Sequence, residues 1–227
     1  YYVWEDGDGT EHFFEVTGSQ PYKDAEGMEL ELRYYNNSTT GMYTDDWAII
    51  TDKEHNEMRF DVVKNGLAWL TATRDACDNR AIWSYVSGHE EEGRIDKITD
   101  PAGRVTKFNY NTDGLIDNIQ IPAAAENTLR TVYYTYDSAK RLTGIRYSEL
   151  GGTAPHTTYA YDGSTKLLTK ARNYDGIQVN VGYESTSLYG TAATDDARRV
   201  KSLETVAANA SGTVVKSGAK ELFEYKN

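Results

Sequence analysis

A short acidic segment near the start of the chain has the residue types of a cation-binding loop. Residues 5–12 read EDGDGTEH, so Asp6 and Asp8 stand two positions apart among glycines. A calcium loop of the EF-hand type presents oxygen ligands at alternating positions, with glycine at the sixth and a bidentate glutamate at the twelfth. Here two Asp-Gly steps separate the strand-like stretches YYVW and HFFEV, and such steps are typical of hairpin turns. We therefore expect a turn without a bound metal, with a calcium loop as the alternative.

Other residues that ligate metals or act as nucleophiles are isolated in the sequence. The four histidines show no HxxH or CxxC spacing, which disfavours a zinc site. They are His12, His55, His89 and His156. Cys77 is the single cysteine, so no intrachain disulfide can form, and no histidine stands nearby to activate its thiol. We expect Cys77 to be buried or at a loop tip, with no catalytic role.

Paired carboxylates are a further possible source of catalysis. The chain contains 35 Asp and Glu residues, and a glycosidase needs two carboxyl groups held about 5 to 9.5 Å apart across a sugar. So many acids produce such a pair by chance, and many aspartates stand at turns, where they have a local role. We therefore predict no catalytic residue, no cofactor and no enzyme activity.

Aromatic side chains provide an alternative function, which is the binding of carbohydrate. Tryptophan and tyrosine present a large apolar surface with a polar tip, and rows of them on a sheet could stack on sugar rings. Trp83 pairs with Tyr85 in the pattern described below, so we expect it to pack. Trp4 and Trp47 lie outside the clear repeats, and Trp69 could face either way. Trp4, Trp47 and Trp69 are the candidate glycan contacts.

A regular repeat positions most of these residues. Pairs of large apolar residues at i and i+2 recur along the chain, as in Tyr134 and Tyr136, and successive residues of a strand alternate between its two faces. The second members of these pairs are separated by steps of 25, 25, 26, 25 and 22 residues. A nearly fixed period of this size indicates a repeat architecture. The repeated aromatic residues are Phe60, Tyr85, Tyr110, Tyr136, Tyr161 and Tyr183.

The repeating unit has the length and turn chemistry of a β-hairpin. About 25 residues accommodate two short strands and two turns, whereas a propeller blade needs about 40. The gaps between apolar pairs contain Asp-Gly, Gly-Gly and Asp-Asn steps instead of helical periodicity. Asp137 and Asp162 follow their tyrosines directly, and an aspartate that begins a turn can accept from a backbone N–H two residues on. We therefore predict an all-β chain of tandem hairpins in an antiparallel sheet, with the repeated aromatics largely buried.

The repeat resembles the YD (tyrosine–aspartate) repeat of Rhs and wall-associated proteins. The resemblance rests on Tyr136-Asp137 with Arg141-Leu142, on Tyr161-Asp162 with Leu167, and on Gly103-Arg104, and it covers residues 45–185. Residues 3–16 and 52–79 resemble the segment that precedes the array in secreted Gram-positive members. Three repeats depart from the pattern, because other residues follow the tyrosine: Asn111 after Tyr110, Glu184 after Tyr183 and Val86 after Tyr85.

The resemblance implies a division of the chain and a function. It implies an N-terminal β region at 1–58, about five hairpin repeats at 59–185 and a tail at 186–227 that begins a further unit. It also implies a curved or spiralling sheet, a section of a secreted, cell-wall-associated shell or stalk that can enclose a toxic C-terminal domain or mediate cell contact. The strand-like stretches at both ends of the sequence suggest a fragment of a longer protein.

Charge and hydropathy narrow the possible partners. The net charge of −11 disfavours nucleic acid, whose phosphates would be repelled. No apolar run approaches the roughly 18 residues of a membrane-spanning helix. The expected partners are neighbouring repeats, with wall glycan or an enclosed domain as further possibilities.

Overall fold

The computed structural model describes residues 1–36, 46–64, 67–89, 92–123, 129–163, 166–184, 199–209 and 211–225. Residues 186–198 of the predicted tail region therefore lie outside the described part. Within the described residues the chain forms 18 strands and one short 3-10 helix at Ser148–Leu150. The strands are β1 (Tyr2–Glu5), β2 (Glu11–Phe14), β3 (Tyr22–Lys23), β4 (Glu31–Tyr35), β5 (Trp47–Thr51), β6 (Glu57–Lys64), β7 (Leu67–Arg74), β8 (Arg80–Tyr85), β9 (Ile95–Thr99), β10 (Val105–Tyr110), β11 (Ile116–Pro122), β12 (Leu129–Tyr136), β13 (Leu142–Tyr147), β14 (Thr157–Tyr161), β15 (Leu168–Arg172), β16 (Ile177–Tyr183), β17 (Val200–Ala208) and β18 (Val214–Leu222).

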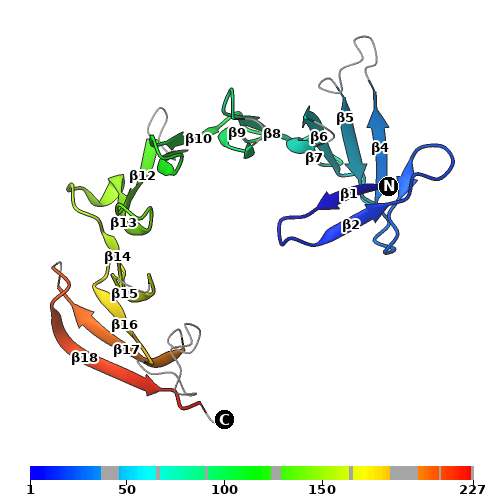
Figure 1. Cartoon of the computed structure of the whole chain (residues 1–227). Helices are drawn as coiled ribbons and strands as arrows, with labels where there is room; N and C mark the ends of the chain where they lie inside the picture. The colour runs from blue at the N-terminus through cyan, green and yellow to red at the C-terminus, as the bar shows by residue number, and fades with distance from the viewer. Residues whose placement is uncertain are drawn as a thin grey trace. The chain divides into compact units, whose positions relative to one another are not determined.

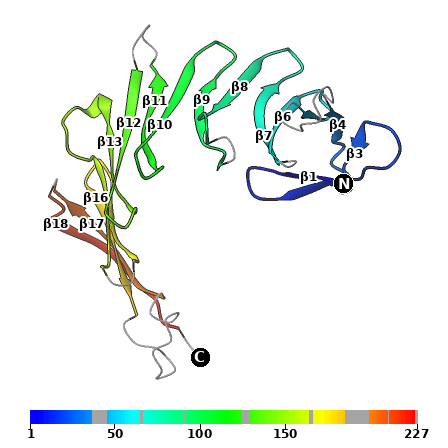
Figure 2. The ribbon, with the colours of Figure 1, turned by 45° about the horizontal axis from the view of Figure 1, so that its top comes forward.

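The strands pair in the order in which they occur along the chain. β1 and β2 form a separate antiparallel hairpin, and β3 to β18 form a sixteen-stranded sheet in which every strand neighbours the strands before and after it. Figures 1 and 2 show successive hairpins side by side within each part of the chain. The prediction of an all-β, antiparallel chain of hairpins is confirmed.

The repeated aromatics occupy equivalent positions in the sheet. Tyr85, Tyr110, Tyr136, Tyr161 and Tyr183 are the last residues of β8, β10, β12, β14 and β16. Phe60 lies inside the longer β6, yet it shares the register of the tyrosines. At five of these six aromatics the pairing register shifts by one residue. The extra residue lies in the return strand, which is the next strand along the chain and pairs with the strand that carries the aromatic. Such a β-bulge bends the strand and increases its twist at the same point of each hairpin.

The burial of the repeated aromatics is substantial, as expected, but it is not complete. The six repeated aromatics are half-buried, and none of them reaches full burial. The physical reason is that the described hairpins form one layer, so a side chain is covered by its neighbours along the sheet and not by a second layer. Full burial of these aromatics would require two packed layers, as in a sandwich.

Two layers do meet at the N-terminal end. The buried residues Phe14, Leu30, Leu32 and Ile50 form a core cluster. Tyr2 and Trp4 of β1 and Phe60 of β6 pack against this cluster, so the β1–β2 hairpin lies on the face of the β4–β6 sheet that carries the first repeated aromatic (Figure 1). Full burial of each such side chain contributes roughly 1.5 to 3 kcal/mol. The N-terminal hairpin therefore covers the aromatic face at the first repeat.

The chain divides into two compact units, Tyr1–Phe108 and Asn109–Asn227. The predicted division into residues 1–58, 59–185 and 186–227 stays a prediction. None of the helices in the described residues is long and apolar enough to cross a membrane.

Candidate functional site

The repeated tyrosines form a series of equivalent hydrogen bonds. Four of the repeated tyrosines, and Tyr225 in the tail, each donate a hydroxyl hydrogen bond to a backbone carbonyl of the preceding hairpin, across 15 to 25 residues of sequence. The bonds run from Tyr85 to Leu70 (2.6 Å), from Tyr136 to Ile116 (2.8 Å), from Tyr161 to Leu142 (2.8 Å), from Tyr183 to Leu168 (2.8 Å) and from Tyr225 to Val200 (2.9 Å). We call this series the tyrosine ladder. Each bond pairs a phenol with a main-chain carbonyl, two polar groups that are costly to bury without a partner.

The position of each acceptor explains the regularity of the ladder. Leu142 is the cross-strand partner of Tyr136, and its carbonyl accepts from Tyr161. Leu168 is the partner of Tyr161 in turn, and its carbonyl accepts from Tyr183. Each hydroxyl therefore reaches the residue that faces the preceding aromatic, which fixes the offset of one hairpin on the next. Tyr225, which lies beyond β18, extends the ladder into the tail.

Burial favours the neutral, donating form of three ladder hydroxyls, those of Tyr85, Tyr136 and Tyr183. Desolvation raises the pKa of Tyr85, Tyr136 and Tyr183 above the ordinary value of 10.0. At Tyr136 the nearby Tyr134 and Asp117 raise the pKa further. A phenolate could not donate, so the raised pKa and the hydrogen bond support one another.

The turns between strands share one geometry. At Asp137 the backbone N–H donates to the carbonyl of Arg141, and Oδ1 accepts from the N–H groups of Ala139 and Arg141, both at 2.9 Å. The predicted hydrogen bond, from the backbone N–H two positions on to the aspartate carboxylate, is thus confirmed. The backbone N–H four positions on donates a second hydrogen bond to the same oxygen. The fourth residue of the turn has positive φ, as at Lys140 (64°). The same pattern occurs in turns that begin at Asp6, Asp52, Asp75, Asp100, Asn111, Asn173 and Asn209.

In four of the aspartate-led turns, the fifth residue donates to the second carboxylate oxygen, whereas the turn at Asp6 has Thr10 at that position. Oδ2 of Asp100 and Asp137 accepts from the guanidinium of Arg104 (2.6 Å) and Arg141 (2.7 Å). Asn56 and Asn79 donate in the same way to Asp52 and Asp75. The asparagine-led turns have Leu115, Ile177 and Thr213 at the fifth position. Asn111, a departure from the family pattern, therefore performs the backbone role of the aspartate with its amide oxygen.

Arg141 also connects two repeats. Besides its bond to Asp137, its Nη1 donates to the carbonyl of Asp162 (3.2 Å), and its guanidinium carbon lies 4.8 Å from the centre of the Tyr161 ring. The residues of the YD motif thus contact one another across successive hairpins. They are structural residues.

A recurring threonine at the bulge was missed from the sequence. Thr143 Oγ1 donates to the carbonyl of Thr135 (3.1 Å), and Thr169 Oγ1 donates to that of Ala160 (3.1 Å). Each threonine is the extra residue of the bulged return strand. The Leu-Thr dipeptide at 142–143 and 168–169, and again at 70–71, is the signal that could have revealed it.

The acidic segment at residues 5–12 is a hairpin turn between β1 and β2, as predicted. Asp6 Oδ1 accepts from the backbone N–H groups of Asp8 and Thr10 (both 3.0 Å), and Oδ2 lies 3.1 Å from Nε2 of the buried His12. Hydrogen bonding to Asp8 and then to His12 lowers the pKa of the Asp6 carboxyl far below its ordinary value. Both oxygens of Asp6 are thus engaged within the protein. No group of three metal-ligating side chains occurs in the described part of the chain.

The three candidate tryptophans each pack against other side chains or the backbone. Trp4 stacks on His12, with ring centres 4.8 Å apart. Trp47 stacks on Tyr35 (5.2 Å), and the guanidinium carbon of Arg59 lies 5.1 Å from its ring centre. A Cβ atom added at Gly93 would lie 3.0 Å from the ring of Trp69, so that ring packs closely on the backbone. Contact of these rings with a glycan stays a prediction.

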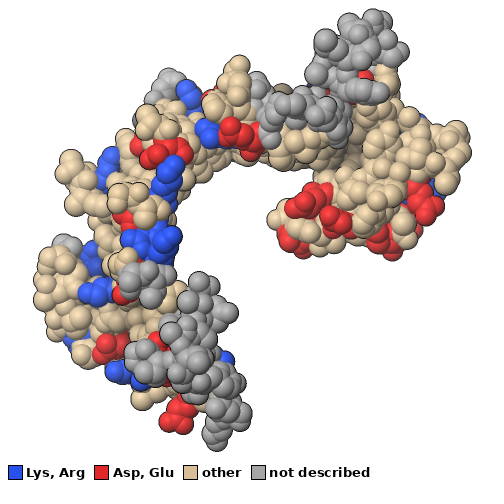
Figure 3. Space-filling model, viewed as in Figure 1, with Lys and Arg blue, Asp and Glu red and all other residues tan. Residues whose placement is uncertain are grey.

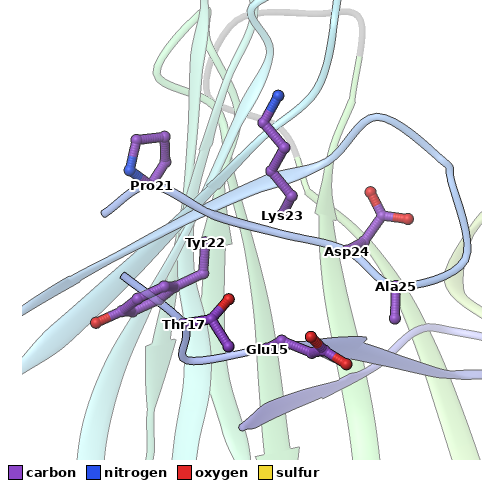
Figure 4. Close-up of a pocket in the computed structure, with 7 residues that line it drawn as sticks. All are labelled: Glu15, Thr17, Pro21, Tyr22, Lys23, Asp24 and Ala25. Atoms are coloured by element: carbon purple, nitrogen blue, oxygen red, sulfur yellow. The ribbon is translucent and has the colours of Figure 1, made fainter. Parts of the chain in front are cut away.

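Two shallow hollows lie beside the edge strand β3. One, of about 500 Å³, is lined by residues 15–25, and Figure 4 shows Lys23 pointing away from Tyr22 and Thr17. Its lining includes the carboxylates of Glu15 and Asp24 together with Tyr22 and Lys23. Asp24 accepts from the backbone N–H groups of Met28 and Leu30 (both 2.7 Å), which assigns it to a turn.

The remaining residues named for chemistry lie at turns and loops. Cys77 is exposed and its thiol is free. Its backbone N–H donates to the carboxylate of Asp75 at the start of the turn, which confirms the loop-tip alternative. His55 occupies the positive-φ position of its turn, and His156 accepts from the N–H of Tyr147. His89 lies 3.0 Å from Glu92. These residues are not brought together.

The fold and its recurring contacts define a tandem β-hairpin repeat protein. No protein-family model matches the sequence, and no curated protein matches it significantly. Among solved structures, the crystal structure of TcdB2-TccC3 without its hypervariable C-terminal region is 11% identical with a TM-score of 0.43, over 88% of this chain and 11% of that one. The TcdB2-TccC3 structure is 12% identical with a TM-score of 0.38, over 82% of this chain and 11% of that one. This chain thus spans about a tenth of the length of the structures it matches.

Proposed function

We propose that this chain is a non-catalytic structural segment of a secreted, cell-wall-associated protein of the Rhs, or YD-repeat, family. The observation that supports it most is the tyrosine ladder, in which the hydroxyls of Tyr85, Tyr136, Tyr161 and Tyr183 each bind the preceding hairpin. Residues that look chemical, the tyrosines and aspartates, are used once per repeat to fix hairpins and turns. An active site is built once, from residues whose positions break such a pattern.

The proposed role is to build surface. Because each hairpin contacts only its neighbours, hairpins can be added in number without a change in the local design. A chain of this kind suits a shell or stalk, which either encloses a C-terminal toxin or mediates contact with another cell. The β1–β2 hairpin, which covers the aromatic face at Phe60, would cap the first repeat.

Enclosure can be tested in the full-length protein. Limited proteolysis should leave the region that follows the repeats intact while the ladder is present. Replacing Tyr136 and Tyr161 together by Phe should open the wall and speed cleavage of that region. Equal protease sensitivity in the wild type and the double variant would contradict enclosure. The stalk would then be the remaining role of the two.

Catalysis and glycan binding are tested on the isolated chain. We expect no turnover of glycans, peptides or phosphoesters and no stoichiometric metal. Turnover that one Asp or Glu substitution abolishes, with the fold intact, would overturn the structural role. A saturable change in tryptophan fluorescence on titration with wall polysaccharide, lost on replacing Trp47, would support the carbohydrate-binding alternative.

A further inference from the structure

Arg172, in β15, is a buried arginine that the repeat pattern does not explain. Its side chain is 9% exposed, and Nε is enclosed without a hydrogen-bond partner. Within the part of the chain that the structure describes, no hydrogen bond or ion pair reaches its guanidinium. The arginines of the turns, such as Arg104 and Arg141, bind carboxylates instead. Burying an unpaired charge is unfavourable, so proteins pair such groups.

The neighbours of Arg172 provide no counter-charge. Thr158 and Gln178 lie directly opposite on the two adjacent strands. The diagonal positions on these strands, which are the next nearest on that face, are His156, Ala160, Gly176 and Asn180. Gln178 donates to Asn180 (2.7 Å), and His156 accepts from the backbone of Tyr147, so both are engaged. The site is therefore a positive charge without an anion among these neighbours.

The same face supplies further donors. Thr158 presents a hydroxyl that has no partner within the described residues. Lys170, two residues before Arg172 on the same face of β15, is exposed and forms no ion pair in that part of the chain. Figure 3 shows Lys and Arg side chains interspersed with Asp and Glu along the chain. An approaching anion would thus meet Lys170 at the surface and Arg172 and Thr158 beneath it.

We propose that Arg172, Thr158 and Lys170 form a binding site for a carboxylate carried by an acidic protein segment. A guanidinium offers a planar fork of N–H groups that matches the two oxygens of a carboxylate. One carboxylate neutralises the one buried charge, and the Thr158 hydroxyl can donate to the same group. A phosphate carries about −1.5 to −2 at pH 7 and would bring excess negative charge into the enclosed site. This site is independent of the proposed repeat scaffold.

Binding is tested on the whole chain with an acetylated, amidated hexaglutamate peptide at constant ionic strength. We expect saturable binding that raises the melting temperature by about 2 to 4 °C at saturation. Hexaglutamine should produce no rise, and inorganic phosphate should produce a smaller one. Binding of phosphate as strong as that of the peptide, or no saturable binding of the peptide, would overturn the carboxylate assignment.

Three variants connect the binding to the site. Arg172→Gln should abolish the rise in melting temperature, and Thr158→Val and Lys170→Gln should each weaken the affinity several-fold. Lys216→Gln, at an exposed position in β18, is the matched control and should bind as the wild type does. Arg172→Lys keeps the charge but loses the fork, so it should fold and bind roughly tenfold more weakly.

A measurement without ligand provides a second criterion. If Arg172 is unpaired, Arg172→Met should melt at the same temperature as the wild type or above it in chloride buffer. A marked fall in the melting temperature of Arg172→Met and Arg172→Lys alike would indicate an internal partner and would overturn the proposal.

Discussion

A tyrosine in the ladder contributes both apolar area and one hydrogen bond, and the two parts can be separated by substitution. Tyr136→Phe keeps the ring and removes the bond to the carbonyl of Ile116, which should cost about 0.5 to 1.5 kcal/mol. Tyr136→Ala should cost about 2 kcal/mol, less than the roughly 3 to 5 kcal/mol of a fully buried ring, because Tyr136 is half-buried. Urea unfolding measures both. Tyr174→Phe, at a position 59% exposed, is the control, and a neutral Tyr136→Phe would contradict the ladder.

The aspartate that begins a turn also has two separable parts. Asp137→Asn keeps an oxygen for the N–H groups of Ala139 and Arg141 but loses the ion pair between Oδ2 and the Arg141 guanidinium. Asp137→Ala loses both, so its urea midpoint should fall further than that of Asp137→Asn. Equal midpoints for the two variants would mean that the backbone hydrogen bonds contribute nothing.

At the scale of the turn, backbone conformation limits which residues fit the fourth position. Lys140 has φ of 64°, whereas the equivalent position of another turn is Gly103, with φ of 77° and open space where a Cβ atom would stand. Left-handed backbone costs a non-glycine residue about 1 kcal/mol. Lys140→Gly should therefore raise the free energy of unfolding by up to about 1 kcal/mol, and Gly103→Ala should lower it by a similar amount. Urea unfolding measures both, and changes of the opposite sign would contradict the conformational explanation.

The pH dependence of stability should have two edges. The Asp137 pKa is lowered, first by the hydrogen bond from the Arg141 backbone, so its contribution is present above the unfolded value of 3.8 and is lost as pH falls below it. Tyr136 and Tyr183 of the ladder have raised pKa values, so their contribution is present below pH 10.0 and is lost as pH rises above it. Denaturation by urea from about pH 2 to 12 measures both edges. In a Tyr136→Phe and Tyr183→Phe double variant the alkaline edge should weaken while the acid edge stays unchanged.

At the scale of the whole molecule, the sequence pattern predicts the hairpins because period and turn chemistry are local. The i, i+2 aromatic pairs and the Asp-led turns both repeat, so the strands and their order follow from them. The ladder is not visible in the sequence, because the partner of each hydroxyl is a main-chain carbonyl one hairpin earlier. The unpaired state of Arg172 is likewise a matter of what surrounds it on adjacent strands, which no spacing within one strand can reveal.

Charge is also distributed at this scale. Residues 1–58 contain 14 acidic and 3 basic residues, so they account for the whole net charge of −11. The repeats and tail are balanced, and their ion pairs are mostly local, as between Asp137 and Arg141. The negative charge therefore disfavours nucleic acid at the N-terminal region more than at the repeats.

The central claim is that hydroxyl-to-carbonyl bonds tie each hairpin to its neighbour, and native-state hydrogen exchange of Tyr161→Phe tests it most directly. This change removes the bond to the Leu142 carbonyl and leaves the ring in place. We expect faster amide exchange in β13, β14 and β15, with exchange in β4 to β6 unchanged, because each repeat contacts only its neighbours. Unchanged exchange everywhere, or an equal increase in all strands, would contradict this claim.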